Sequence, residues 1–298
     1  MSTAVRTPRP VAALVVVAMD EEARPFLDAL APFDDVDEVL LLGAARARSL
    51  ALPGAAAAGG GALAVDGGAL AAIGADAGPG GDSIGGSPAD RLVPRAGRRP
   101  AGPRELVLVR SGIGLVAAAS ALATALTRLA PAVVLSAGTT GGLGREVEVG
   151  DVCVSTTLAY TDADATAFGY AHGQTPGQPA VFEADAAVLA RVEAVGPAAL
   201  RGATASSADA RIRAGQMLAG NSFVTAANAG RVRELFPGAV STDMESTALA
   251  QVAASAGVPF ASVRGVSDLC GPEAGQDFHI GADEAAARSA AVVLAALG

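Results

Sequence analysis

Short apolar runs alternate with amphipathic segments along most of the chain. The first run, 11–18, is apolar on both faces, which is typical of a central parallel strand covered on both sides. Similar runs predict strands at 39–42, 106–109, 133–137, 151–157 and 260–266, and the run 216–219 precedes a short loop at 220–222. Helices are predicted at 21–30, 115–129, 183–195, 244–256 and 283–297. This alternation indicates an α/β fold with a mainly parallel sheet covered by helices.

The pattern is interrupted between about residues 43 and 104. Segment 54–89 holds 12 Gly and 12 Ala, and no basic residue occurs from 49 to 90. A stretch with so few large side chains cannot offset the entropy that is lost on ordering. We therefore expect a single domain spanning 1–298 that carries a disordered, low-complexity surface insertion at about 43–104.

The overall composition excludes several classes of protein. Apolar residues make up 51% of the 298 residues and charged residues 17%, which supports a large core and argues against a wholly disordered chain. The net charge of −9 argues against an electrostatic nucleic-acid binder. No apolar stretch of about 18 residues appears, so we expect no membrane span.

Two features favour a cytoplasmic location. The apolar run 11–19 superficially resembles a signal peptide, but the acidic residues 20–22 follow it at once and no small-residue cleavage site is evident. Cys153 and Cys270 lie far apart without a CxxC or Cys/His cluster, so neither a disulfide framework nor a zinc site is expected. We expect a reduced chain without a metal.

Acidic residues directly follow the first predicted strand. Asp20, Glu21 and Glu22 at the start of a helix would complement the helix dipole, which accounts for them without any function. Alternatively, Glu22 faces a pocket and holds a water molecule as a general base.

Two glycine-containing segments also follow predicted strands. The first, SGIG at 111–114, lacks the full dinucleotide fingerprint and the Lys-Ser/Thr pair of a P-loop. The second, predicted as a loop at 138–142, would let a ligand approach the backbone closely, but glycine turns after strands are common. Neither segment identifies a cofactor by itself.

Two later segments, 242–245 and 265–268, place acidic residues at the predicted end of a strand or the start of a helix. In the first, Thr242 or Asp243 is an N-cap of the following helix, or Glu245 accepts two hydrogen bonds from the hydroxyls of a sugar on which Met244 packs. In the second, Asp268 is a simple cap, or it protonates a departing purine while Ser267 orients its carboxylate.

Six segments can be compared with known families: VVVAMDEEARPF (15–26), SGIGLVAAASALATAL (111–126), AGTTGGLGREVEVGDVCVS (137–155), YTDADATAFGYAHGQTPGQP (160–179), AGNSFV (219–224) and TDMESTALAQVAASAGVPFASVRGVSD (242–268). In these segments the chain resembles the 5′-methylthioadenosine/S-adenosylhomocysteine nucleosidases of the purine-nucleoside phosphorylase superfamily. The resemblance covers about two thirds of the chain, in matching order and spacing.

The resemblance implies an α/β domain with a central mixed, barrel-like sheet flanked by helices, which assembles as a homodimer. It places the water-activating acid on Glu22, the ribose-binding pair on Met244 and Glu245, and the acid that protonates N7 on Asp268, supported by Ser267. The further substrate-binding residues that it implies are Phe223 and Val224 for adenine, Ile113 for the 5′ substituent, Thr139 beside the water and ribose, and Phe168 and Pro176 donated by the partner subunit.

The implied reaction is hydrolysis of the N-glycosidic bond of 5′-methylthioadenosine and S-adenosylhomocysteine, with 5′-deoxyadenosine as a further substrate. Adenine is released, and no cofactor, metal, nucleic acid or membrane takes part. The chain departs from the family at Thr161, at Asn221 and Ser222, and over 270–283. These departures leave futalosine or aminofutalosine hydrolysis as an alternative. A phosphorylase, for which Arg24 would be a nearby cation, and a non-catalytic nucleoside-binding module are further alternatives.

Overall fold

A ten-stranded mixed sheet forms the centre of the described part of the chain. The computed structural model describes residues 7–53, 104–270 and 280–298. The sheet contains β2 (Ala13–Val17), β3 (Val39–Leu40), β4 (Arg46–Leu52), β5 (Arg104–Arg110), β7 (Val134–Gly142), β8 (Val152–Tyr160), β9 (Phe182–Glu183), β10 (Ile212–Ala219), β11 (Ala239–Asp243) and β12 (Phe260–Asp268). A separate parallel pair is formed by β1 (Arg9–Val11) and β6 (Leu129–Pro131).

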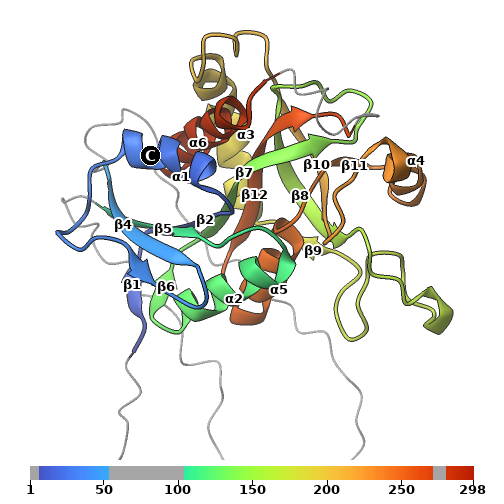
Figure 1. Cartoon of the computed structure of the whole chain (residues 1–298), viewed down its shortest axis with the longest axis horizontal. Coiled ribbons are helices and arrows are strands. Elements are labelled where there is room, and N and C mark those ends of the chain that lie inside the picture. The colour runs from blue at the N-terminus through green and yellow to red at the C-terminus, as the bar shows by residue number, and fades with distance from the viewer. Residues whose placement is uncertain (1–6, 54–103, 271–279) are drawn as a thin grey trace, which may run out of the picture.

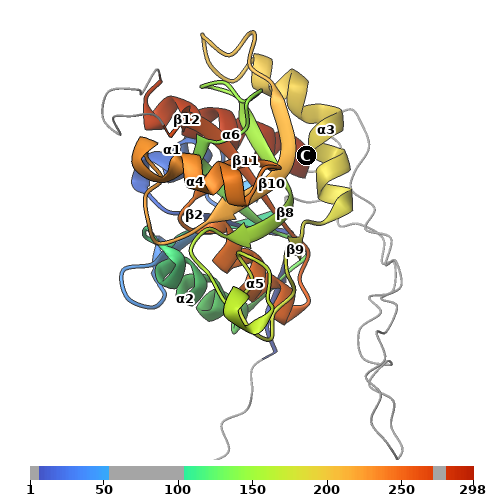
Figure 2. The same ribbon diagram turned by 90° about the vertical axis from the view of Figure 1, so that its right-hand side faces the viewer.

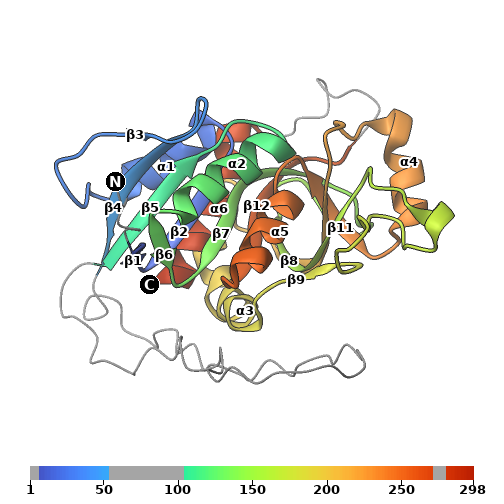
Figure 3. The same cartoon turned by 90° about the horizontal axis from the view of Figure 1, so that it is seen from below.

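One part of this sheet closes into a barrel. The strand order is β11-β10-β8-β12-β7-β2-β5-β4-β3, and β11 also pairs with β7. Strands β7, β12, β8, β10 and β11 therefore form a closed ring, while β2, β5, β4 and β3 extend from it as an open sheet (Figure 3). The predicted fold class, an α/β fold with a mixed, barrel-like sheet flanked by helices, is confirmed.

Helices cover both faces of the sheet. They are α1 (Asp20–Ala29), α2 (Leu115–Leu126), α3 (Ala186–Arg201), α4 (Ala226–Leu235), α5 (Ser246–Ala256) and α6 (Ala282–Leu297), with a short 3₁₀ turn at Thr166–Phe168. Helices α1 and α6 lie above the sheet in Figure 1 and α2 and α5 below it, while α4 lies beside β10 and β11 (Figure 2). Among the described residues, no helix has the length and apolar character needed to cross a membrane.

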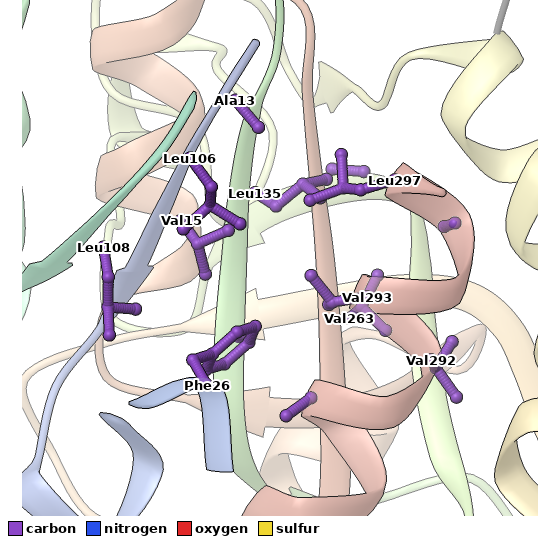
Figure 4. Packing of buried hydrophobic residues seen from close by; sticks show 14 of the residues in the cluster. Ala13, Val15, Phe26, Leu106, Leu108, Leu135, Val263, Val292, Val293 and Leu297 are labelled. Atoms are coloured by element: carbon purple, nitrogen blue, oxygen red, sulfur yellow. The ribbon is translucent and has the colours of Figure 1, made fainter. Parts of the chain in front are cut away.

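The alternation of side chains along β2 explains why both faces need helices. Ala13, Val15 and Val17 belong to the core cluster shared with α1, α3 and α6, whereas Leu14 and Val16 belong to the cluster shared with α2 and α5. Figure 4 shows the first cluster, with side chains of α1 and α6 packed against β2, β5, β7 and β12. The strand is buried on both faces, as its continuous apolar run predicts.

Three predictions about local structure are wrong. Segment 138–142 is not a loop, because β7 continues through Gly142. Thr242 and Asp243 end β11, and the helix begins only at Ser246. The predicted insertion begins too early, because Arg46–Leu52 is a strand that pairs antiparallel with β5; residues 54–103 of that prediction lie outside the described residues.

Candidate active site

A cavity of about 190 Å³ collects the candidate polar residues. Its lining follows the ends of β2, β5, β10, β11 and β12 and includes the last residues of β7, which is where ligands gather in α/β sheets. Nine of the eleven predicted site residues line it: Glu22, Ile113, Thr139, Phe223, Val224, Met244, Glu245, Ser267 and Asp268. The cavity is also lined by Ala18, Met19, Thr140, Gly141, Ser222, Thr242, Asp243, Arg264 and Cys270.

Glu22 is held by four hydrogen bonds at the start of α1. Its Oε2 accepts from the backbone N–H groups of Ala18 (2.7 Å) and Met19 (3.2 Å). Its Oε1 accepts from the N–H (2.8 Å) and the hydroxyl (3.0 Å) of Thr139. The side chain is almost fully buried, so its carboxylate has one fixed orientation at the edge of the cavity.

Gly138 makes room for this carboxylate. It has a φ of +129°, and a β-carbon at this position would lie 2.3 Å from Oε1 of Glu22. Likewise, a β-carbon on Gly141 would lie 2.6 Å from Sγ of Cys270 and 3.3 Å from Oδ1 of Asp268. The glycines of this segment therefore let protein side chains approach the strand.

Glu245 lies two residues after the end of β11, and its carboxylate faces the guanidinium of Arg264. Its Oε1 accepts from the N–H of Gly114 (2.8 Å), and its Oε2 lies 3.1 Å from Nη1 of Arg264. Burial raises the pKa of Glu245 to about 7; Arg264 opposes this shift, and the negative charges of Asp243 and Glu22 add to it. The carboxyl group therefore changes its charge close to neutral pH.

Arg264 is a buried residue of β12 that the sequence analysis missed. Its Nη1 donates to the carbonyl of Thr139 (3.0 Å), its Nε and Nη2 donate to Oγ of Ser136 (3.1 and 2.9 Å), and its Nε lies 3.6 Å from Oδ2 of Asp243. Burial opposes its charge, but the carboxylates of Asp243, Glu245 and Glu22 raise its pKa overall. A signal was present, since Arg264 is the one charged residue in the apolar run 260–266.

Asp268 is oriented by its neighbours at the end of β12. The hydroxyl of Ser267 donates to Oδ2 (3.0 Å), and the backbone N–H of Cys270 donates to Oδ1 (2.9 Å). Burial and the nearby Asp268 raise the pKa of the Cys270 thiol to about 12, so this sulfur is neutral at physiological pH. Asp268 thus presents a fixed carboxyl group to the cavity.

The last two predicted site residues, Phe168 and Pro176, do not line the cavity of their own chain. The side chain of Phe168 is 83% exposed, and Pro176 is exposed as well. Their predicted contact with a partner subunit stays a prediction.

A second and larger cavity, of about 670 Å³, lies beside β4, β5 and the end of α2. Arg9, Asp34, Asp37 and Arg128 lie around it, and no predicted site residue lines it. We therefore place the candidate active site in the smaller cavity. Among residues 7–53, 104–270 and 280–298, no group of His, Cys, Asp or Glu is suited to holding a metal ion.

Comparisons with known proteins agree with this geometry. A sequence model of the Phosphorylase superfamily matches residues 98–298. The chain is 37% identical to the 5′-methylthioadenosine/S-adenosylhomocysteine nucleosidase of Actinobacillus succinogenes over 195 residues, which cover 65% of this chain and 81% of the relative. The nucleosidase of Anoxybacillus flavithermus is 37% identical over 189 residues, covering 63% and 78% of the two chains.

Solved structures of nucleosidases are similar to this chain over almost its whole length. The nucleosidase of Neisseria meningitidis in complex with methylthio-immucillin-A has a TM-score of 0.71 at 27% identity and covers 96% of this chain and 98% of its own. The nucleosidase of Colwellia psychrerythraea in complex with adenine has a TM-score of 0.70 at 25% identity, covering 98% and 95%. The fold and the site thus define a hydrolase that acts on N-ribosyl bonds. The chain belongs to the phosphorylase superfamily and, within it, to the 5′-methylthioadenosine/S-adenosylhomocysteine nucleosidases.

Replacing Gly138 tests whether the position of Glu22 matters. In Gly138→Ala, the new methyl group would displace the Glu22 carboxylate, because no space exists for both. A displacement of about 1 Å in a catalytic group can cost a factor of about 100 in rate, so we expect kcat to fall by about that factor. Steady-state kinetics together with a thermal melt would measure the effect.

Gly43→Ala is the matched control. Gly43 also has a positive φ, of +65°, but nothing lies within 4 Å of its missing β-carbon, so this variant introduces backbone strain without a clash. Its kcat should equal that of the unmodified protein. A Gly138→Ala protein with unchanged kcat would show that catalysis does not depend on where Glu22 lies.

Proposed function

We propose that the protein hydrolyses the N-glycosidic bond of 5′-methylthioadenosine and S-adenosylhomocysteine, releasing adenine and a 5-thioribose product. One observation carries the proposal. Three of the four carboxyl groups that line one small cavity, those of Glu22, Glu245 and Asp268, come from different parts of the chain and lie there together with the apolar side chains of Met244 and Phe223. The names of the relatives, and the inhibitor and adenine complexes of the similar structures, point to the same substrates.

In this proposal, Asp268 is the general acid on the purine side. As the bond between C1′ and N9 breaks, its electron pair goes to the purine, and Asp268 donates a proton at N7 so that adenine leaves as a neutral base. The contacts from Ser267 and from the N–H of Cys270 hold the carboxyl group in one orientation, which positions the proton before the reaction begins.

Glu22 and Thr139 act on the water. All of the usual acceptor sites of the Glu22 carboxylate are occupied, so a water molecule needs one donor to turn away. The hydroxyl of Thr139 is the donor that can rotate, whereas the three backbone N–H groups are fixed. The water then donates to Glu22, its oxygen attacks C1′, and its proton passes to the carboxylate.

Glu245 binds the sugar in this scheme. Its ionised carboxylate accepts hydrogen bonds from the two ribose hydroxyls, and Met244 packs against the ring. As positive charge develops on the ribosyl group, the attraction to this carboxylate strengthens, so the contact favours the transition state over the bound substrate.

The charges of the cavity favour water over phosphate as the second substrate. Among the described lining residues, the one basic side chain is Arg264, and it is already paired with Glu245 and close to Asp243. Arg24, the cation that the phosphorylase alternative would use, is exposed and does not line the cavity. A phosphate dianion would therefore enter a site with four carboxyl groups and no unpaired cation among these residues.

A homodimer is part of the proposal. Ile113 and Phe223 are 58% and 53% exposed at the cavity, which is a large exposure for apolar side chains at a binding site. Phe168 and Pro176 of a second subunit would cover them and complete the pocket for the 5′ substituent.

We also propose that 1–298 acts as one catalytic domain and, because both cysteines are free thiols, that it works in the cytoplasm.

Release of free base in phosphate-free buffer tests the function. The purified protein is incubated separately with 5′-methylthioadenosine, S-adenosylhomocysteine and futalosine, and the base is identified by chromatography. Adenine from the first two without phosphate supports the proposal. Hypoxanthine from futalosine alone would replace it with the futalosine alternative, and base release that requires phosphate would replace it with the phosphorylase alternative.

Asp268→Asn tests the general acid. The amide keeps the shape of the side chain but cannot donate a carboxyl proton, so we expect kcat to fall by about 10²- to 10⁴-fold while nucleoside binding is retained. Calorimetry measures the binding and steady-state kinetics the turnover. Asp209→Asn, at an exposed position away from the cavity, is the control and should leave both unchanged. Near-normal turnover in Asp268→Asn would refute the assigned role.

The pH dependence of kcat/KM tests Glu245. Because the ionised carboxylate is the form that accepts the ribose hydroxyls, and its pKa is about 7, kcat/KM should rise about tenfold per pH unit below pH 7 and level off above it. The side chain of Glu245→Gln cannot ionise, so the rise in kcat/KM below pH 7 (the acid-side step) should be absent in this variant, and most of the activity should be lost. The assignment fails if the step persists in Glu245→Gln.

A further inference from the structure

One edge of the Arg264 guanidinium bonds a hydroxyl group rather than a carboxylate. The Nε–Nη2 edge of an arginine normally forms a forked pair with a carboxylate. Here both N–H groups of that edge converge on the single hydroxyl oxygen of Ser136, at 3.1 and 2.9 Å. The neighbouring carboxylate of Asp243 is farther away, at 3.6 Å, and its Oδ2 accepts no hydrogen bond in the described structure.

This arrangement directs the remaining arm of the guanidinium toward the sugar-binding acid. With Nε and Nη2 engaged by Ser136, Nη1 donates to the carbonyl of Thr139 and lies 3.1 Å from Oε2 of Glu245. If the hydroxyl of Ser136 were missing, the Nε–Nη2 edge would turn to the free oxygen of Asp243. The cation would then move away from Glu245.

Ser136 is itself held by a chain of buried hydroxyl groups. An oxygen that accepts two N–H groups from a cation must point its own hydrogen elsewhere, and Oγ of Ser246 lies 3.2 Å away. Oγ of Ser246 in turn lies 2.8 Å from Oγ of Ser262, which stands opposite Ser136 in the register of β7 and β12. All three serines are fully buried, so each hydroxyl must find its partner within the protein.

We propose that Ser136, held by Ser246 and Ser262, is a positioning residue that keeps Arg264 against Glu245 and so favours the ionised form of the sugar-binding carboxylate. The inference rests on the proposed role of Glu245. It adds a specific task for three buried hydroxyls, none of which lines the cavity.

The ionisation of the Glu245 carboxyl group depends on the charges around it. Asp243 on β11 and Glu22 on α1 disfavour its negative charge, whereas Arg264 on β12 and the N–H of Gly114 favour it. Without Arg264 at close range, the carboxyl group of Glu245 would hold its proton to higher pH. A protonated carboxyl group accepts the ribose hydroxyls poorly.

The test is the pH profile of kcat/KM for 5′-methylthioadenosine in Ser136→Ala. We expect the step on the acid side to move upward by about one pH unit, which lowers kcat/KM about tenfold at pH 6 and leaves it near that of the unmodified protein at pH 9. Ser136→Thr keeps a hydroxyl and should restore the original profile. A uniform loss at every pH, or an unmoved step, would overturn the proposal.

Two further variants separate positioning from general loss of packing. Ser207→Ala removes another fully buried hydroxyl, one that bonds Thr204 away from the cavity, and should lower the melting temperature without moving the step. Ser262→Ala breaks the hydroxyl chain and should move the step in the same direction by a smaller amount. If Ser136→Ala does not fold, Ser262→Ala decides the question, and an unmoved step there overturns the proposal.

A second measurement does not depend on turnover. Titration of the Glu245 carboxyl carbon by ¹³C NMR, assigned with Glu245→Gln, follows its protonation directly in the unmodified protein and in Ser136→Ala. An upward shift supports the positioning role even if no nucleoside is cleaved, in which case the proposed function fails and this inference stands. Identical titrations in the two proteins overturn it.

Discussion

A single buried positive charge organises the side of the barrel that faces the cavity. Transfer of an ion of this size out of water costs several kcal/mol even after the protein relaxes, so Arg264 is tolerated only because neighbouring strands supply compensating groups. Strand β7 provides the hydroxyl of Ser136 and the carbonyl of Thr139. The carboxylate of Asp243 comes from the end of β11, and that of Glu245 from two residues further on. Closure of the barrel and placement of Glu245 therefore depend on each other.

Three of the four acids that line the cavity, Glu22, Glu245 and Asp268, differ in what holds their carboxyl groups. Glu22 is surrounded by four donors, Glu245 by one cation and one N–H group, and Asp268 by a hydroxyl and a backbone N–H. Like charges in one small space would otherwise compete for the same protons. Glu22 lies on α1, Asp268 ends β12, and Glu245 lies between β11 and α5, so a different part of the chain holds each carboxyl group.

The sequence predicted the parts of the fold whose burial is continuous. Strand β2 is apolar at every position because helices cover both of its faces, and that pattern is visible without a structure. Strand β4 was missed because Arg46–Leu52 combines residues of low strand preference with only two large apolar side chains; pairing with β5 determines its conformation. The glycines of segment 138–142 predict a loop, but in the structure they admit side chains to a strand.

The candidate site was predictable where chemistry and element ends coincide, as at Glu22, Glu245 and Asp268. It was less predictable where a residue acts through another. The Asp243 carboxylate does cap the helix start, accepting from the N–H groups of Glu245 and Ser246, but it does so from the end of a strand. Arg264 is a lone charge inside an apolar strand, and its partners on β7 and at the end of β11 are distant in the sequence, so the sequence does not reveal what it binds.

The register of the hairpin formed by β4 and β5 has a consequence for how this protein can vary. Leu52 and Arg104 lie directly opposite each other, so the two strands reach the point of connection side by side, at the end of the open sheet and away from the barrel. A connection at such a point has no distance to span, and the entropy of closing it grows only with the logarithm of its length. Sequence can therefore be gained or lost at this point at little entropic cost and without a change in the register of β4 and β5.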